Sequence, residues 1–535
     1  MSTVKDVTFD LLRRLGLTTI VGNPGSTEEP FLKDFPKDFD YVMALQEASV
    51  VSLADGLSQG LRKPVIVNLH TGAGTGNAMC AILTAYLNKT PLIITAGQQT
   101  RDMLLIEPML TNIDATSLPR PWVKWAYEPA RAQDIPAAFM RAYATAVQQP
   151  AGPVYLSLPL DDWDQPMDAT DVLRTVSTRV GPDPARVTEF GARINAAMAP
   201  VLVYGADMAR GGADVWADGI ALAERLGVPV WASPFCERPP FPETHPQFAG
   251  PLPPAIAPLS ALLKGHDLIV VIGAPVFRYY PYVPGSYLPE GAELLQVTDD
   301  PDAASKAAIG DSLVSDAGLF LKALLPQVNA RVAFAGGPLR KPPQTPTGEL
   351  PLTPAAVYAT LNALLPDDFV LTQESPSNIP QLQDQIRVRK PDVSYAFASG
   401  ALGWTTPAAV GLALAERQSG RNRPVLCVMG DGSFQYSIQG VYTGVQQKAH
   451  LIYVVLQNEE YGILKEFAEL ENTPNVPGLD LPGLDIVSLG KAYGANTSKA
   501  ETTEELAGAF KGALDHHGTS VIVVPITRAL RGLLG

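Results

Sequence analysis

The fold of this chain is decided by the stretch Val425-Leu426-Cys427-Val428-Met429-Gly430-Asp431-Gly432-Ser433. Its first five residues form an unbroken apolar run, which is typical of a strand that is buried on both faces of a parallel sheet. The two glycines allow a tight turn and a close approach of the backbone to a ligand. A helix that begins at this turn offers free N–H groups and the positive end of its dipole, so the stretch predicts a strand–turn–helix unit suited to phosphate.

The next predicted strand, residues 451–456, ends at Gln457-Asn458. A strand–helix–strand unit returns the chain to the same edge of the sheet, so we expect Asp431 and Asn458 to converge. Carboxylate and amide oxygens are ligands that Mg²⁺ accepts together with phosphate oxygens, and a backbone carbonyl near Glu460 could complete the protein ligands. A Gly-Asp-Gly alone is more often a simple turn. The strand before it, the helix after it and the following Asn favour the metal site.

The rest of the chain shows the same alternation of apolar strands and helices. This pattern predicts an α/β protein with three doubly wound parallel-sheet domains. Its length of 535 residues agrees, at roughly one domain per 150 residues. We place the domains at residues 1–175, 183–325 and 353–535, with a Pro- and Gly-rich linker over residues 326–352. No G-x-G-x-x-G motif opens a helix in the middle segment, so a dinucleotide site has no support there.

Composition excludes several classes of protein. The chain has 40 basic and 54 acidic residues, a net charge of −14, which argues against nucleic acid or an anionic membrane as a partner. No uncharged apolar run reaches the ~18 residues of a membrane helix, and the charged N-terminus does not read as a signal peptide. The three cysteines are widely spaced, which indicates a reducing, cytoplasmic location. We expect Cys80 and Cys427 to be buried.

The pattern of Gly430-Asp431-Gly432 followed by Asn458 resembles the signature of thiamin diphosphate enzymes. More closely, the chain resembles the benzoylformate decarboxylase-like family, in the superfamily of 2-oxo acid decarboxylases and acetohydroxyacid synthases. The stretches that carry this resemblance are residues 22–26, 31–35, 44–48, 74–79, 95–101, 118–125, 271–279 and 475–483. The resemblance implies a pyrimidine-binding, a middle and a diphosphate-binding domain. It also implies thiamin diphosphate and Mg²⁺, clasped between subunits of a homodimer at least, usually a homotetramer.

Glu47 is the predicted activating carboxylate. It closes an apolar strand and opens an apolar helix, where burial would raise its pKa and let it share a proton with the aminopyrimidine of the cofactor. The resemblance implies the same role, because the family places its activating Glu at this position. The alternative is a Glu at a helix start, favoured by the dipole. Glu28 could belong to the same polar pocket, although a solvated turn carboxylate is equally consistent with the sequence.

Ser26 and His70 are the candidates for handling a 2-oxo acid. Both follow strands of the first domain, where α/β sheets place ligands. Loss of CO₂ requires polar groups around the substrate carboxylate and an acid near the carbon that is protonated afterwards. The resemblance implies that Ser26 binds the carboxylate and carbonyl, and that His70 transfers a proton. The alternatives are a helix N-cap for Ser26 and a structural His70.

The substrate pocket departs from the family pattern at two places. Where the family has a second histidine after Phe-Arg-Tyr, this chain has Tyr280, whose reference pKa of about 10 is far above the roughly 6.5 of histidine. Protonation there should be slower, which favours carboligation. Ile463 replaces a small Ala before Leu464, which predicts less room for a phenyl ring. Phe467 matches an aromatic wall of the family, and we expect Leu110 to line the same pocket.

The resemblance also assigns residues to the cofactor. Leu402 matches the bulky residue beneath the bent cofactor, and Pro376 stands where the family has a Thr. The expected cofactor-binding set is Glu47, Ser377, Gly400, Leu402, Gly430, Asp431, Gly432, Ser433, Asn458, Tyr461 and Gly462, with Asp431, Asn458 and Glu460 at the metal.

The expected function is decarboxylation of a benzoylformate-like 2-oxo acid to an aldehyde and CO₂, without oxidation. The first alternative is a carboligase or lyase that forms or cleaves 2-hydroxy ketones or 2-hydroxyacyl thioesters, with aldehydes among its substrates. A flavin-carrying oxidase or synthase would need an FAD cleft in the middle domain, and a colourless protein would exclude it. A catalytically dead scaffold is disfavoured, because Glu47, His70, Asp431 and Asn458 are all present.

Overall fold

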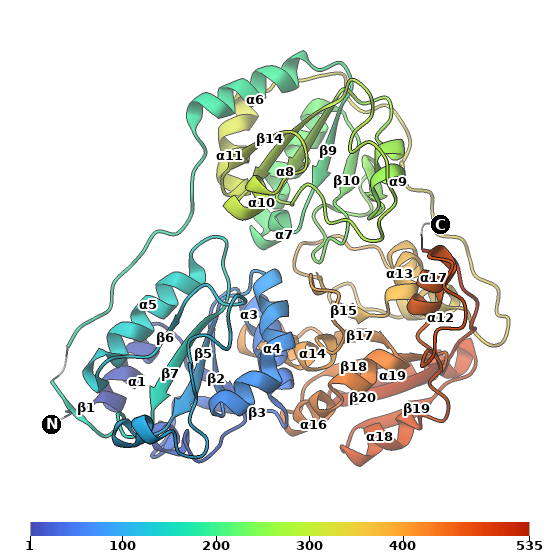
Figure 1. The fold of residues 1–535 in the computed structure, drawn as a ribbon. Helices are drawn as coiled ribbons and strands as arrows, with labels where there is room; N and C mark the ends of the chain where they lie inside the picture. The colour runs from blue at the N-terminus through green and yellow to red at the C-terminus, as the bar shows by residue number, and fades with distance from the viewer. Residues whose placement is uncertain (1, 169, 534–535) are drawn as a thin grey trace.

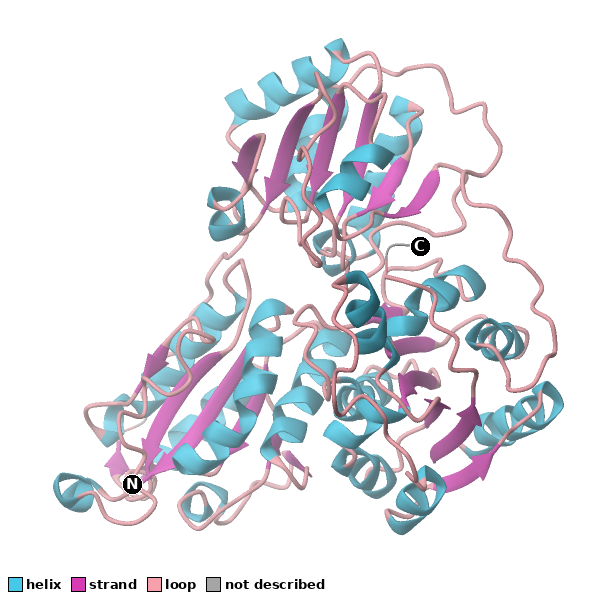
Figure 2. Cartoon of the chain, turned by 45° about the vertical axis from the view of Figure 1, so that its right-hand side comes forward, coloured by secondary structure: helices cyan, strands magenta, loops and turns pink. Residues whose placement is uncertain are grey.

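The computed structural model describes residues 2–168 and 170–533, and shows three α/β units (Figure 1). In Figure 1 the first unit lies at the lower left, the middle unit at the top and the third at the lower right. Each unit has one six-stranded sheet whose neighbouring strands all run parallel, with helices on its faces (Figure 2). The expected α/β class with three parallel-sheet domains is therefore confirmed, whereas the domain limits stay a prediction.

The first sheet has the strand order β3-β2-β4-β5-β7-β6. Its strands are β2 (Thr19–Gly22), β3 (Asp40–Met43), β4 (Val65–Leu69), β5 (Leu92–Gln98), β6 (Ala126–Tyr127) and β7 (Val154–Pro159). The helices of this unit are α1 (Val4–Arg14), α2 (Glu29–Leu32), α3 (Glu47–Leu61), α4 (Thr71–Leu87) and α5 (Ile135–Val147), with 3₁₀ turns η1 (Arg101–Ile106) and η2 (Ala132–Asp134). A short antiparallel pair, β1 (Ser2–Thr3) with β8 (Pro166–Met167), ties its two ends together.

The third sheet repeats this topology in the order β16-β15-β17-β18-β20-β19. Its strands are β15 (Val370–Glu374), β16 (Ser394–Tyr395), β17 (Val425–Gly430), β18 (Leu451–Gln457), β19 (Asn496–Lys499) and β20 (Thr519–Pro525). Its helices are α12 (Pro354–Asn362), η4 (Pro376–Asn378), α13 (Ile379–Gln385), α14 (Thr405–Gln418), α15 (Asp431–Tyr436), α16 (Gln439–Gln446), α17 (Gly462–Leu470), α18 (Ile486–Ala492) and α19 (Thr503–His516). In both sheets the direction of winding reverses next to the first strand of the unit, which is where α/β sheets bind ligands.

The middle sheet is wound differently, in the order β11-β10-β9-β12-β13-β14. Its strands are β9 (Pro200–Tyr204), β10 (Val230–Ala232), β11 (Phe248–Pro251), β12 (Leu268–Ile272), β13 (Glu293–Thr298) and β14 (Asp311–Val314). Its helices are α6 (Pro184–Ala196), α7 (Asp207–Arg210), α8 (Ala213–Leu226), α9 (Ile256–Leu262), α10 (Pro301–Ser305) and α11 (Ala317–Leu324), followed by η3 (Leu325–Gln327).

The first and third units share one apolar core, built largely from α3, α4 and α14 and from the sheet faces beneath them. Glycines let α3 and α14 touch through their backbones: a Cβ on Gly411 would lie 2.1 Å from the Leu53 carbonyl oxygen, and one on Gly56 would lie 2.2 Å from that of Ala408. Buried Asp55 fixes the same contact, because it accepts a hydrogen bond of 2.7 Å from Trp404 Nε1. These two units are therefore held as one body.

Two further observations concern the expected linker and cysteines. The segment after η3 has no helix or strand over residues 328–350, but it is anchored: Arg340 donates to the carbonyl of Gln383. Cys427 is buried as expected, whereas Cys80, which lies in α4, is exposed. The burial expected for Cys80 is wrong.

Within the described residues, no helix is both long and apolar enough to cross a bilayer.

Candidate functional site

The polar residues expected from the sequence gather at the switch points of the first and third sheets. Residues 23–28 follow β2 and His70 follows β4, the two strands that flank the first switch point. In the third sheet, Ser377 follows β15 and Asp431 follows β17, with Asn458 after the neighbouring β18. Parallel strands bring these loops to one edge of each sheet, which produces one polar cluster in the first unit and a second in the third.

Glu47 lies at the first position of α3 and its side chain is buried. Asn23 Nδ2 donates to Glu47 Oε1 at 3.2 Å, and Asn77 Nδ2 donates to Oε2 at 3.0 Å. The helix is capped not by Glu47 but by the Gln46 side chain, which accepts from the N–H groups of Ala48 and Ser49. The Glu47 carboxylate therefore does not cap the helix, and the side-chain amides of Asn23 and Asn77 fix its orientation.

His70 is held by Glu28, a residue whose role the sequence left open. Glu28 is buried, and its Oε2 lies 2.8 Å from His70 Nδ1. Its Oε1 accepts from the N–H of Gly97 at 2.8 Å and from that of Thr71 at 3.2 Å. Because Glu28 contacts Nδ1, the Nε2 of His70 is the ring nitrogen that remains free for a ligand. The solvated-turn reading of Glu28 is therefore wrong.

Ser26 is exposed and stands in the turn between β2 and α2. The N-cap position of α2 belongs to Glu28, so the alternative reading of Ser26 as a helix cap is wrong. Its neighbour Gly25 lies against the His70 ring, because a Cβ built there would be 2.0 Å from Nδ1. This loop therefore carries Ser26 next to the imidazole with a hydroxyl that is open to a ligand.

Asp431 begins α15 and is buried. Its Oδ1 accepts from the N–H of Gly432 at 2.8 Å, and its Oδ2 accepts from the N–H of Glu459 at 2.7 Å. Burial raises the pKa of Asp431 to about 6, although these backbone hydrogen bonds oppose the shift. Glu459, which the sequence did not indicate, thus ties the β18 loop to Asp431 through a backbone with φ of +56°.

The loop after β18 brings the other expected ligands beside Asp431. The Asn458 Oδ1 accepts from the N–H of Glu460 at 3.3 Å, and Gly462 packs between Asn458 and Ser377. The Glu460 carboxylate pairs with Lys465, so only its backbone oxygen remains available to a metal. Among residues 2–168 and 170–533, no three His, Cys, Asp or Glu side chains are grouped to hold a metal ion. Carboxylate, amide and carbonyl oxygens with open positions fit Mg²⁺ that also takes phosphate oxygens.

Small residues allow close packing around the Asp431 cluster. A Cβ on Gly432 would lie 2.6 Å from the Tyr461 ring and 3.0 Å from Leu481. Ser433 is buried in the first turn of α15. Gly400, with φ of +71°, and partly buried Leu402 lie in the loop before α14. These residues form a cradle around Asp431, in which the contact at Gly432 leaves no room for a side chain, whereas a Cβ on Gly400 would meet no atom within 4 Å.

Glu374 is a buried acid of this region to which the sequence gave no role. It ends β15 and accepts hydrogen bonds from the N–H groups of Gly403 at 2.6 Å and Thr405 at 2.9 Å. Burial raises its pKa to about 7. Through these two hydrogen bonds, the Glu374 carboxylate holds the loop that contains Leu402 against the start of α14. An acid that follows an apolar run in the sequence, as Glu47 also does, is the signal that could have indicated Glu374.

The expected substrate residues come from three different units of the chain. The Tyr280 ring, 59% exposed, lies 4.8 Å from the Phe467 ring between centroids, so the middle domain meets α17 here. Ile463 is partly buried and Leu464 is 45% exposed on the same helix. Leu110, with φ of +68°, is partly buried in a loop of the first unit. Within the described residues, no hydrogen bond or ion pair joins the Glu47 cluster to the Asp431 cluster.

Three models of thiamine pyrophosphate enzyme domains match the chain: the N-terminal binding domain over residues 2–118, the central domain over residues 187–324 and the C-terminal binding domain over residues 381–524. The benzoylformate decarboxylase of Pseudomonas aeruginosa is 45% identical over 98% of this chain and 99% of that protein.

Solved structures agree with these matches. The benzoylformate decarboxylase of Polynucleobacter necessarius is 65% identical with a TM-score of 0.98, over 99% of this chain and 100% of that one. The thiamine diphosphate-dependent 4-hydroxybenzoylformate decarboxylase of Rhodococcus jostii RHA1 is 40% identical with a TM-score of 0.94. The match covers 98% of this chain and 99% of that one. This chain belongs to the benzoylformate decarboxylase family of thiamin diphosphate enzymes.

Proposed function

We propose that this chain decarboxylates an aromatic 2-oxo acid of the benzoylformate type to an aldehyde and CO₂, using thiamin diphosphate and Mg²⁺. The observation that carries the proposal is the pair of clusters at the two switch points: buried Glu47 in one, and the Asp431 cradle in the other. Thiamin diphosphate, when bound, would supply a nucleophilic carbon for the substrate carbonyl and a cationic ring that takes up the electrons left by CO₂.

The residues of the third unit would hold the diphosphate and its metal. Asp431 Oδ, Asn458 Oδ1 and the Glu460 backbone oxygen are the proposed metal ligands, and the first turn of α15 receives the phosphates. Ser377, Gly400, Gly430, Gly432, Ser433, Tyr461 and Gly462 complete the cradle, and Leu402 supports the middle of the cofactor. The open space at Gly400, where a Cβ would meet no atom within 4 Å, and the buried Ser433 support this assignment.

The residues of the first unit would carry out the proton chemistry. Glu47, oriented by Asn23 and Asn77, hydrogen-bonds the aminopyrimidine and holds its proton. Ser26 would bind the substrate carboxylate through its exposed hydroxyl. His70 Nε2, free because Nδ1 faces Glu28, would hold and transfer the proton that the product carbon receives.

We further propose that two copies of the chain complete each site, as a homodimer at least and in the form of a homotetramer. No described bond joins the two clusters within one chain. Apolar side chains in η1 and just after it are exposed, including Leu105 at 94%, Met109 at 84% and Ile106 at 72%. Exposed apolar loops of this kind are typical of association surfaces. The free cysteines support the cytoplasm as the location.

A second activity, carboligation of aldehydes to 2-hydroxy ketones, is favoured by Tyr280. This phenol stands where the family has a histidine and packs on Phe467, so it can donate a hydrogen bond but lacks the two ring nitrogens with which a histidine relays protons. Slower protonation of the product carbon would leave time for an aldehyde to react there instead. Ile463 and Phe467 would set the size of the ring that the pocket accepts.

The test is a panel of aromatic and aliphatic 2-oxo acids, assayed with thiamin diphosphate and Mg²⁺ for CO₂ and, with added aldehyde, for 2-hydroxy ketone. We expect CO₂ release from benzoylformate that depends on both cofactors. CO₂ release with a large share of 2-hydroxy ketone would support the second activity. No cofactor-dependent CO₂ release from any 2-oxo acid would refute the proposal.

A further inference from the structure

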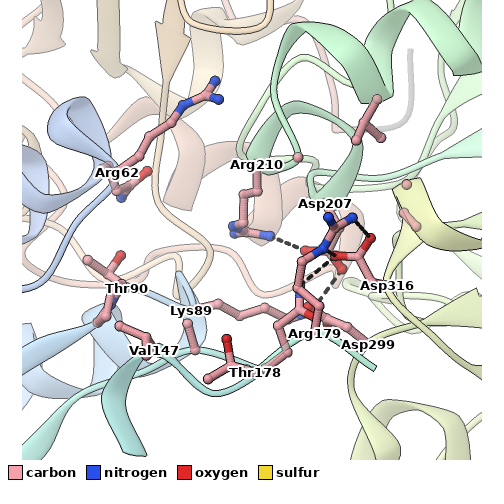
Figure 3. A pocket seen from close by; sticks show the side chains of 18 of the residues that line it. Arg62, Lys89, Thr90, Val147, Thr178, Arg179, Asp207, Arg210, Asp299 and Asp316 are labelled. Atoms are coloured by element: carbon pink, nitrogen blue, oxygen red, sulfur yellow. Dashed lines mark hydrogen bonds and ion pairs between the residues drawn. The ribbon is translucent and has the colours of Figure 1, made fainter. Parts of the chain in front are cut away.

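A cavity of about 470 Å³ lies between the first unit, the segment that follows it and the middle unit. Its volume falls within the roughly 300–1,000 Å³ of small-molecule sites. None of the residues proposed for the thiamin site lines this cavity. Figure 3 shows Arg62 and Lys89 reaching it from the first unit, Arg179 from the connecting segment, and Arg210 from the middle unit.

The lining carries more positive than negative charge. Seven basic side chains and four acidic ones surround the cavity, an excess of three positive charges. Ion pairs occupy some of the basic groups: Lys89 Nζ lies 2.9 Å from Asp207 Oδ2, and Arg179 Nη2 lies 2.6 Å from Asp316 Oδ1 (Figure 3). Arg210 also pairs with Asp207, at 2.7 Å. For Arg62, Arg238 and Lys322, the described residues provide no carboxylate within ion-pair distance.

Arg238 has an unsatisfied donor in this wall. Its side chain is only 3% exposed, and its Nε–H has no hydrogen-bond acceptor among the described residues. Its guanidinium stacks on the Tyr395 ring at 3.9 Å, and burial together with the charges of Arg210 and Arg62 lowers its pKa. A buried donor without an acceptor is costly. The Arg238 charge, which no described carboxylate within ion-pair distance neutralises, adds to the positive character of the cavity wall.

Arg62 closes the cavity from the side of the first unit. It follows α3 in the left-handed conformation, and its Nη1 would lie 2.4 Å from a Cβ built on Gly212. Gly212 is the N-cap of α8 and provides no side-chain cap, so the first turn of this helix presents free N–H groups beside the guanidinium. A guanidinium next to an uncapped helix start is a favourable environment for an oxyanion.

We propose that this cavity binds a small molecule through an oxyanion, either a phosphate or a carboxylate group, with Arg62, Arg238 and Lys322 as its cationic partners. Because Glu47 begins α3 and Arg62 follows the end of that helix, the bound anion would also stabilise the helix that carries the proposed activating carboxylate. The site is distinct from the substrate pocket, whose expected residues lie elsewhere.

The experiment is calorimetric titration of the enzyme, already loaded with thiamin diphosphate and Mg²⁺, with inorganic phosphate and separately with succinate. Loading first keeps phosphate out of the diphosphate cradle. We expect at least one of the two anions to bind, with weaker affinity at higher salt. Phosphate alone would identify a phosphoryl ligand, and succinate alone a carboxylate ligand.

Two variants locate the binding. Arg62→Gln and Lys322→Gln should each weaken it about tenfold, the loss expected for one charged partner. Lys511→Gln, at an exposed lysine of α19, should bind as the wild type does. Circular dichroism checks that each variant is folded. Binding of neither anion, wild-type affinity in both cavity variants, or equal weakening in Lys511→Gln would overturn the proposal.

Discussion

At the residue scale, the close contact between Gly25 and His70 explains why the loop after β2 needs glycine at this position. Replacing Gly25 by Ala would push a methyl group to within 2.0 Å of His70 Nδ1. The imidazole must then shift away from Glu28, and a shift of about 1 Å at a reacting group costs about a hundredfold in rate. We expect Gly25→Ala to lower kcat for 2-oxo acid decarboxylation by about this factor, with unchanged thiamin diphosphate affinity by calorimetry.

Gly76→Ala is the matched control for this prediction. Gly76 lies in α4, near the same cluster, and a Cβ there would have no atom within 4 Å. Its kcat should equal that of the wild type. Equal kcat values for Gly25→Ala and Gly76→Ala would contradict the role given to His70.

The raised pKa of the Glu374 carboxyl group predicts that the stability of the protein depends on pH. Its pKa is raised from 4.5 to about 7 in the folded chain, so folding binds a proton between these values and the stabilising contribution falls as pH rises through them. Glu374→Gln removes this titration. The stability of the wild type relative to the variant should therefore decrease between pH 4.5 and 7 by about 3 kcal/mol at most, and stay constant above. Thermal denaturation of the wild type and of Glu374→Gln at several pH values across this range measures the difference in stability.

Glu349→Gln serves as the control for this titration, because Glu349 is exposed in the linker. Its melting temperature should follow that of the wild type at each pH. A constant difference between wild type and Glu374→Gln from pH 4.5 to 8 would show that burial does not shift this carboxyl group.

At the level of elements, the backbone contact of α3 with α14 holds the first and third units together. A methyl group on Gly411 would meet the Leu53 carbonyl oxygen at 2.1 Å, so Gly411→Ala must separate the helices. Overpacking of this kind destabilises by about 1–3 kcal/mol. We expect a lower melting temperature for Gly411→Ala in thermal denaturation.

The control is Gly508→Ala in α19, where a Cβ meets nothing within 4 Å. Alanine is the better helix former, so this variant should be as stable as the wild type or more stable, by about 1 kcal/mol at most. If Gly411→Ala melted at the same temperature as Gly508→Ala, the two helices would not be in the contact described.

The sequence predicted these elements best where a long apolar run was bounded by turn residues. The helix that Glu47 was expected to open is α3 (Glu47–Leu61), and the strand expected at 425–429 is β17 (Val425–Gly430). Short edge strands such as β6 and β16 were missed, because two residues carry no periodicity that can be recognised. The strand that Glu47 was expected to close ends earlier, at Met43 in β3, because Gln46 already caps α3 and the strand has no room to extend.

For the site, the sequence located the residues that follow strands but not the contacts between them. Ser26, His70, Asp431 and Asn458 all stand at the expected strand ends. The pairing of Glu28 with His70 and of Glu459 with Asp431 depends on loop geometry, which no spacing encodes. The cavity at Arg62 and Arg238 arises only where two units meet, so no motif indicated it.

At the scale of the whole molecule, a cofactor site that is shared between two copies of the chain requires self-association. Leu105 is 94% exposed in η1, beside exposed Ile106 and Met109. A charge in an apolar interface costs about 2 kcal/mol, or about thirtyfold in dissociation constant. We expect Leu105→Asp to shift the protein toward a lower molecular mass in analytical ultracentrifugation.

Val332→Asp is the control for this surface, because Val332 is 88% exposed in the linker, away from η1. It should sediment as the wild type does. A monomeric wild type, or identical masses for Leu105→Asp and the wild type at every concentration, would count against association through η1.

The most direct test of the central claim, that Glu47 of one copy and the Asp431 cluster of another act on one cofactor, is complementation. Glu47→Gln and Asp431→Ala chains should each be inactive alone. When both are expressed together, a mixed dimer has one site with both lesions and one site with neither. We predict that the mixture regains cofactor-dependent CO₂ release from benzoylformate. A mixture that forms mixed dimers but stays as inactive as its parents would contradict the account.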